Sequence, residues 1–177
     1  MKRYTQILVT LVIALTLSAC GSRSIGNKID DQFVGPEVAS SITQAHPDLS
    51  SPTSRIVVSS YNGVVLLAGQ TPRAELKELA AQTARKVQGV KKIYNELQVQ
   101  QPASLLARSN DSLLTSKIKT QMLAEANVPS SKVKVITENG IVYLLGVVNR
   151  SEANAATSVV QSVSGVQKIV RLFEYTN

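Results

Sequence analysis

An internal repeat is the feature that most restricts how this chain can fold. Residues 62–69, Asn-Gly-Val-Val-Leu-Leu-Ala-Gly, match residues 139–146, Asn-Gly-Ile-Val-Tyr-Leu-Leu-Gly, at five of eight positions and a shift of 77 residues. Flanking segments also align, 55–58 with 132–135 and 89–93 with 165–169. Self-similarity of this kind indicates repeated copies of one structural unit. The sequence therefore predicts two similar modules in tandem.

Each copy has the same order of predicted elements: helix, strand, strand, helix, strand. Apolar residues at helical spacing open both copies, with Val34, Val38 and Ile42 equivalent to Leu114, Ile118 and Met122. Asn-Gly then separates two apolar runs, which is a strong hairpin signal because both turn residues need a positive φ. We expect an α+β fold in which two helices of each module pack on one face of a small mixed sheet.

The second helix of each copy has its own boundary signals. It is predicted over residues 72–88 in the first copy and 149–164 in the second. Pro72 fits the first helical position, and Asn149 with Glu152 fits a capping box. The glycines after these helices, Gly89 and Gly165, fit the C′ position. Four further glycines are expected to fix backbone geometry: Gly63, Gly69, Gly140 and Gly146.

The first residues are typical of a secretory signal. Lys2 and Arg3 give a basic start, and residues 7–17 form an apolar run that is too short to span a bilayer. The run ends in Leu-Ser-Ala-Cys-Gly, which resembles the lipobox of bacterial lipoproteins, where the thiol of the Cys receives a lipid. The alternative is an ordinary signal peptide that carries a Cys after its cleavage site.

The lipobox resemblance implies a location in the cell as well as a lipid modification. Cys20 would be the lipid attachment site, and a Gly rather than an Asp at position 21 implies the periplasmic face of the outer membrane. We accordingly divide the chain into a signal peptide 1–19, a lipidated tether 20–27, a first module 28–99, a linker 100–109 and a second module 110–177.

Composition excludes several classes of function. A single His and a single Cys are too few for a His-based zinc site, a disulfide or a Cys–His dyad, so we expect no enzyme, no metal and no cofactor beyond the lipid on Cys20. The formal net charge of +7 favours an anionic partner. Because an exported protein does not normally meet nucleic acid, a phospholipid head group or an acidic protein surface is the expected partner.

The doubled hairpin motif resembles that of a known family. Paired α-β-β-α-β modules with Asn-Gly-x-[Val/Ile]-x-Leu-x-Gly, followed by Gly-Val-x-x-Ile, are similar to BON domains. Two of them behind a lipobox resemble the division- and envelope-stress-associated outer-membrane lipoproteins. The resemblance implies a non-enzymatic protein that binds anionic phospholipid such as phosphatidylglycerol or cardiolipin. It also implies a role in outer-membrane integrity and enrichment at the division septum.

The helix predicted over residues 112–124 has two different faces. On a wheel of about 100° per residue, Leu114, Ile118 and Met122 fall together on the core side. The opposite side carries the residues that we expect to contact phospholipid: Leu113, Ser116, Lys117, Lys119, Thr120 and Leu123. Apolar groups that insert between lipids and cations that meet phosphates are what an interfacial helix requires.

The first copy lacks this outward face. Glu37, Ala39 and Thr43 stand where the second copy has Lys117, Lys119 and Leu123, and Gly-Pro at 35–36 is expected to interrupt the start of the helix. We therefore predict that the second module binds lipid and that the first supports it.

Two alternatives stay open at this stage. The exposed leucines could pack on the neighbouring module, or could be scattered surface residues of the kind that most proteins carry. A different function is that of an adaptor for an envelope protein partner, such as the barrel assembly machinery or a cell-wall amidase regulator. Such an adaptor would bind its partner through a sheet edge or the groove between modules and would not bind lipid directly.

Overall fold

The structure is a computed structural model that describes residues 25–176, with side chains from residue 33 onward. The predicted signal peptide 1–19 and the predicted lipid attachment site Cys20 lie outside the described residues. Among the residues that are described, no helix is long and apolar enough to cross a membrane.

The first module has the predicted order of elements. It consists of α2 (Ile25–Ala45), β1 (Arg55–Tyr61), β2 (Val64–Thr71), α3 (Ala74–Arg85) and β3 (Lys92–Val99), with a short 3₁₀ turn at Pro47–Leu49. The strands lie in the order β1-β2-β3, where β1 and β2 are antiparallel and β2 and β3 are parallel. The sheet is thus mixed, as expected.

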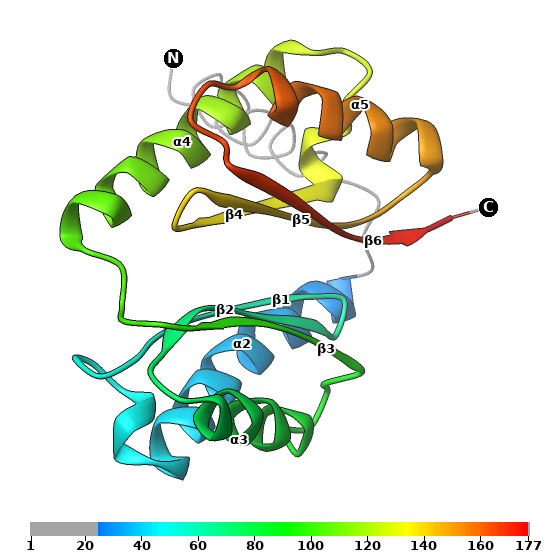
Figure 1. Cartoon of the computed structure of the whole chain (residues 1–177). Helices are drawn as coiled ribbons and strands as arrows, with labels where there is room; N and C mark the ends of the chain where they lie inside the picture. Colours follow the sequence, from blue (N-terminus) through cyan, green and yellow to red (C-terminus); the bar gives the residue numbers. More distant parts are fainter. Residues whose placement is uncertain (1–24, 177) are drawn as a thin grey trace, which may run out of the picture.

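The second module repeats this architecture. It consists of α4 (Leu105–Ala124), β4 (Val133–Glu138), β5 (Ile141–Val148), α5 (Arg150–Ser162) and β6 (Lys168–Tyr175). The sheet order β4-β5-β6 again combines an antiparallel pair with a parallel pair. In each module the two helices cover one face of the sheet (Figure 1).

The two Asn-Gly turns adopt the backbone conformation that the sequence predicts. Asn62 and Gly63 have φ of 54° and 79°, and Asn139 and Gly140 have φ of 50° and 75°. Both central residues of each two-residue loop are therefore left-handed, the conformation of a hairpin turn whose twist matches its strands. Gly69 and Gly146 have a different role, because an added Cβ would collide with the backbone carbonyls of β1 and of the residue before β4.

The two sheets pack against each other through the faces that the helices leave free (Figure 1). Residues of β1, β2, β5 and β6 form a shared apolar cluster: Tyr61, Leu66, Ala68, Ile141, Tyr143, Leu145 and Leu172. Every residue of β2 is buried, and so is nearly all of β5. A strand that is covered on both faces has apolar residues at nearly every position. This explains why the sequences of β2 and β5 are almost continuously apolar.

Polar contacts cross the same interface. The buried carboxylate of Glu138, which is 2% exposed, accepts from Arg55 Nε at 2.9 Å and from Gln70 Nε2 at 3.2 Å. The hydroxyl of Tyr61 donates to the carbonyl of Lys132 at 2.8 Å. A buried charge is tolerated when it is paired and hydrogen-bonded, so these contacts fix how one sheet sits on the other.

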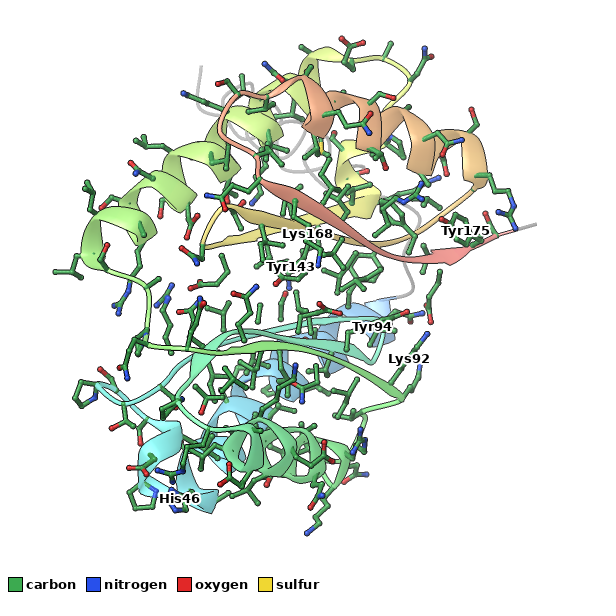
Figure 2. All side chains as sticks on the ribbon, in the orientation of Figure 1. His46, Lys92, Tyr94, Tyr143, Lys168 and Tyr175 are labelled. Carbon is green, nitrogen blue, oxygen red and sulfur yellow. The ribbon has the colours of Figure 1, made fainter. Side chains whose placement is uncertain are left out.

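Tyr143 lies in the middle of this interface, between the two sheets (Figure 2). Its side chain is 1% exposed, and burial raises the pKa of its phenol to about 12. The ring therefore stays neutral at physiological pH and acts as a packing residue between the modules.

The first helix of each module differs from the sequence prediction. Helix α4 begins at Leu105 rather than within residues 110–112, because Ser104 caps it by accepting from the amide of Ala107 at 3.2 Å. The linker is thus shorter than the predicted 100–109.

Helix α2 begins at Ile25, inside the predicted tether 20–27, and continues through Pro36 instead of being interrupted there. A proline removes only one helical hydrogen bond, and the buried residues on either side of it hold the helix in place.

The second helices are shorter than predicted. Helix α3 begins at Ala74 and not at Pro72, because Thr71 still belongs to β2, where it pairs with Val99. At the other end, the amides of Lys86 and Val87 bond to carbonyls three residues back, so the α-helix has ended well before Gly89. Helix α5 ends at Ser162, ahead of Gly165. The predicted capping box of Asn149 and Glu152 is present, with bonds of 2.8 and 2.9 Å.

Two glycine substitutions separate a steric role from a purely conformational one. Gly69 and Gly165 have similar φ values of 117° and 102°, but only at Gly69 would a Cβ collide with backbone, namely with the Arg55 carbonyl oxygen. We expect Gly165→Ala to lower the free energy of unfolding by about 1–2 kcal/mol through backbone strain. Gly69→Ala should lower it by at least about 2 kcal/mol more. Urea denaturation measures both, and equal losses would contradict this account.

Candidate membrane-binding face of helix α4

Helix α4 has the two faces that the sequence predicts. Leu114, Ile118 and Met122 are 7%, 0% and 2% exposed and belong to the apolar core of the second module. On the opposite side, Leu113 is 61% exposed and Leu123 is 74% exposed. The other predicted contact residues, Ser116, Lys117, Lys119 and Thr120, are also exposed. The alternative in which the leucines pack on the first module is therefore wrong.

Two further leucines belong to the same face, and the sequence analysis missed them. Leu105 is 77% exposed and Leu106 is 72% exposed. Leu105 lies about five turns before Leu123 and in line with it, and Leu106 lies about two turns before Leu113. The residues 104–106, Ser-Leu-Leu, carried the missing signal, because a Ser before an apolar pair is a helix start. We call Leu105, Leu106, Leu113 and Leu123 the leucine face of α4.

Three hydroxyl groups on this face are already hydrogen-bonded within the helix. Ser112, Ser116 and Thr120 each donate to the carbonyl four residues earlier, at 3.1, 3.0 and 3.0 Å. A hydroxyl that keeps its hydrogen bond costs far less to remove from water than one that loses it. The polar residues between the leucines therefore present few unsatisfied groups to an apolar surrounding.

Lys117 and Lys119 lie on opposite flanks of the leucine face. Both are exposed, and neither makes an ion pair or a hydrogen bond with a residue in the described part of the chain. Their ammonium groups can therefore meet an external anion without breaking an internal contact. An exposed apolar strip with free cations at its margins is the arrangement of an interfacial helix.

The equivalent helix of the first module is different in kind. Among the described side chains of α2, Phe33 is the one large apolar residue that is exposed, at 68%. It occupies the position equivalent to Leu113, since its neighbour Val34 aligns with Leu114 and both are buried. From residue 33 onward, α2 thus offers a single aromatic where α4 offers four leucines and two lysines.

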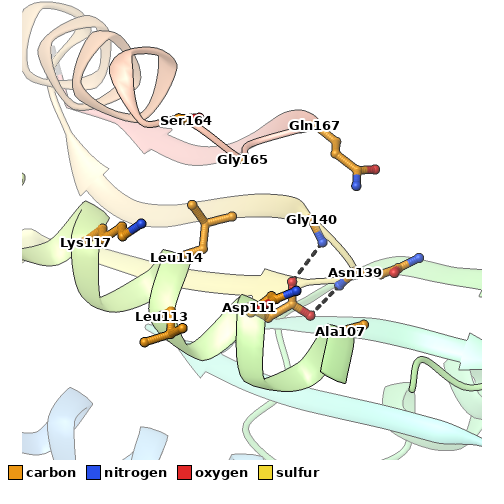
Figure 3. Close-up of a pocket in the computed structure, with 11 residues that line it drawn as sticks. Ala107, Asp111, Leu113, Leu114, Lys117, Asn139, Gly140, Ser164, Gly165 and Gln167 are labelled. Carbon is orange, nitrogen blue, oxygen red and sulfur yellow. Dashed lines mark hydrogen bonds between the residues drawn. The ribbon is translucent and has the colours of Figure 1, made fainter. Parts of the chain in front are cut away.

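A cavity of about 320 Å³ lies beside α4, between this helix, the β4–β5 turn and the loop before β6 (Figure 3). Leu113 and Lys117 of the proposed lipid-contacting face also line this cavity. In the cavity wall, the carboxylate of Asp111 accepts from the backbone amides of Asn139 at 2.7 Å and Gly140 at 2.9 Å. Asp111 is 7% exposed, so this buried acid ties the helix to the hairpin turn and fixes its orientation.

Removal of the Asp111 carboxylate tests how α4 is held. We expect Asp111→Ala to lower the free energy of unfolding by about 2–3 kcal/mol, because two partly buried backbone amides lose a charged acceptor. The neighbouring exposed residue Asn110 provides the control, and Asn110→Ala should change stability by less than about 0.5 kcal/mol. Chemical denaturation of both variants measures the difference, and similar values would contradict the anchoring role.

Comparisons with known proteins agree with the duplicated architecture. The profile of the BON domain matches twice, over residues 37–101 and 110–177. The chain is 39% identical to "Outer membrane lipoprotein DolP" of Haemophilus influenzae over 157 residues, which cover 89% of this chain and 80% of that protein. It is 38% identical to "21 kDa hemolysin" of Actinobacillus pleuropneumoniae, over 86% of this chain and 78% of that protein.

A third relative is more distant. "Osmotically-inducible protein Y" of Escherichia coli is 31% identical over 148 residues, which cover 82% of this chain and 72% of that protein. Two profile matches that together span most of the chain, and relatives that align across both modules, establish the family. The chain belongs to the BON domain family and carries two copies of that domain.

Proposed function

We propose that this protein is a lipid-anchored, non-catalytic component of the outer membrane that binds anionic phospholipid through the leucine face of α4. The observation that carries the proposal is the alignment of four exposed leucines along one helix, with a free lysine on either flank. Phosphatidylglycerol and cardiolipin are the anionic lipids we expect it to bind. The role in the cell is support of outer-membrane integrity, with enrichment at the division septum.

The anchor is the second part of the proposal. Cys20 follows an apolar run in a sequence that resembles a lipobox, and a relative that aligns over most of the chain is named an outer membrane lipoprotein. Only a short segment separates Cys20 from the start of α2 at Ile25. A lipid on Cys20 would hold both modules near the periplasmic face of the bilayer, so that α4 meets lipid at a high effective concentration.

The leucines and the lysines supply different parts of the binding energy. Each Leu side chain that leaves water contributes up to about 1.5–3 kcal/mol, so four of them exceed the contribution of the charges. Each Lys near an anionic surface adds about 1 kcal/mol and distinguishes anionic from zwitterionic lipid. The leucines therefore provide affinity, and the lysines provide the choice of lipid.

A charge placed within the leucine face should remove binding. In a titration of residues 21–177 with phosphatidylglycerol micelles, we expect amide shifts to concentrate on α4, and Leu113→Glu to reduce them at least tenfold. Phe33→Glu is the matched control, because it makes the same change at the equivalent exposed position of the first module. Binding that survives Leu113→Glu but not Phe33→Glu would assign lipid binding to the first module. An absence of binding in the unaltered chain would favour a protein client.

Salt should separate the contributions of charge and apolar contact. Binding of the unaltered chain to phosphatidylglycerol vesicles should weaken as ionic strength rises, because salt screens the exposed lysines. The double variant Lys117→Gln, Lys119→Gln should bind more weakly at low salt and respond little to added salt. Co-sedimentation at several salt concentrations measures both effects, and an unchanged salt response in the double variant would exclude these lysines as the anion contacts.

A further inference from the structure

A second cavity, of about 220 Å³, lies where the two modules meet, apart from the leucine face. Most of its lining comes from the first module: Ala39 and Thr43 of α2, the turn 49–54 and the start of β1 at Arg55. One lining residue, Arg108, comes from α4 of the second module. The turn after α2 and the linker that leads into α4 lie on the same side of the molecule (Figure 1).

Arg108 reaches this cavity with most of its donors uncommitted. Its Nε donates to the carbonyl of Ala103 at 3.0 Å, which orients the planar guanidinium. Its two Nη groups make no hydrogen bond or ion pair with any residue from 33 to 176. A half-buried guanidinium that is fixed at Nε and free at both Nη groups is prepared to bind an oxyanion through two parallel bonds.

The remaining lining suits an anion as well. Arg55 is 31% exposed on its side chain and uses its Nε for Glu138, whose carboxylate is buried in the interface and does not line the cavity. Ser51 adds a hydroxyl group, whereas the hydroxyls of Ser50 and Ser54 already donate to the carbonyls of Pro47 and Asp48. The lining includes no acidic side chain. Glu138 offsets the charge of Arg55. The cavity therefore has a net positive charge, which Arg108 supplies.

The cavity beside α4 is a poorer candidate for the same ligand. It contains one cation, Lys117, together with the buried carboxylate of Asp111. The junction cavity instead combines two guanidinium groups with the hydroxyl of Ser51 and lies between two modules.

We propose that the cavity between the modules binds a phosphate-bearing anion, held by Arg108 from the second module and by Arg55 and Ser51 of the first. The volume of about 220 Å³ accommodates a phosphate group with a small substituent such as glycerol. A ligand held from both sides would also strengthen the contact between the modules. This site goes beyond the leucine face and does not depend on it.

The test is a titration of the full lipoprotein in dodecyl maltoside micelles, which carry neither phosphate nor charge. Inorganic phosphate is one probe, and glycerophosphoglycerol, the soluble head group of phosphatidylglycerol, is the other. We expect NMR shifts at the amides of residues 50, 51, 53 and 54 and at the Nε–H of Arg108. Arg108→Gln should weaken binding at least tenfold, and Arg108→Lys should weaken it less, because a lysine keeps the charge but not the planar fork.

Three further variants control for general charge, for access to the cavity and for the leucine face. Arg85→Gln removes an exposed arginine of α3 that pairs with Glu78, and it should leave binding unchanged. Thr43→Trp keeps both arginines but places a bulky ring on an exposed position of the cavity rim, and it should weaken binding as much as Arg108→Gln. Leu113→Glu should leave phosphate binding intact, which separates this site from the proposed lipid face.

The two probes distinguish the source of the anion. Stronger binding of glycerophosphoglycerol would identify a lipid head group, and stronger binding of inorganic phosphate would identify a free anion; either result supports the site. An absence of localised shifts with both probes would overturn the proposal. Shifts that Arg108→Gln and Arg85→Gln reduce equally would also overturn it.

Discussion

The packing of the two sheets against each other is the contact on which the rest of the structure depends. Each module alone would have a helix-covered face and a bare apolar face, and the bare faces close on one another around Tyr143. The ion pair of Arg55 with the buried Glu138 ties the two modules together within this contact. The described helices α2, α3, α4 and α5 are consequently outermost, because both inner layers of the described fold are sheet (Figure 1).

This arrangement determines what α4 can do. One side of the helix is needed for the core of the second module, and Asp111 fixes its orientation against the hairpin turn. The opposite side has no partner in the described part of the chain, and it carries the leucine face. The four leucines lie along a helix of about 30 Å and take no part in the core of the second module. Their alignment is the observation that supports the proposed membrane binding.

Much of the fold could be predicted from the sequence, because the strongest signals are local. The Asn-Gly turns and the repeated apolar runs each depend on a few neighbouring residues, and the structure confirms them. The packing of one sheet on the other could not be predicted. A continuous apolar run indicates that both faces of a strand are buried, but it does not show which element covers the second face. The start of α4 was placed too late because Pro102 suggested a linker, while the Ser104 cap acts only two residues later. The junction cavity was missed because Arg55 and Arg108 are far apart in the sequence and line the same cavity only in the folded chain.

The most direct test of the central claim measures how deeply each residue of α4 lies in a bilayer. The lipidated protein can be reconstituted in nanodiscs of phosphatidylglycerol that contain a spin-labelled lipid, and the relaxation of each amide then reports its distance from the membrane. Our account predicts the largest enhancements at Leu105, Leu113 and Leu123, smaller ones at Leu114 and Ile118, and a repeat of about 3.6 residues. Uniform enhancement along α4, or a maximum on α2, would contradict the claim that the leucine face is the membrane contact.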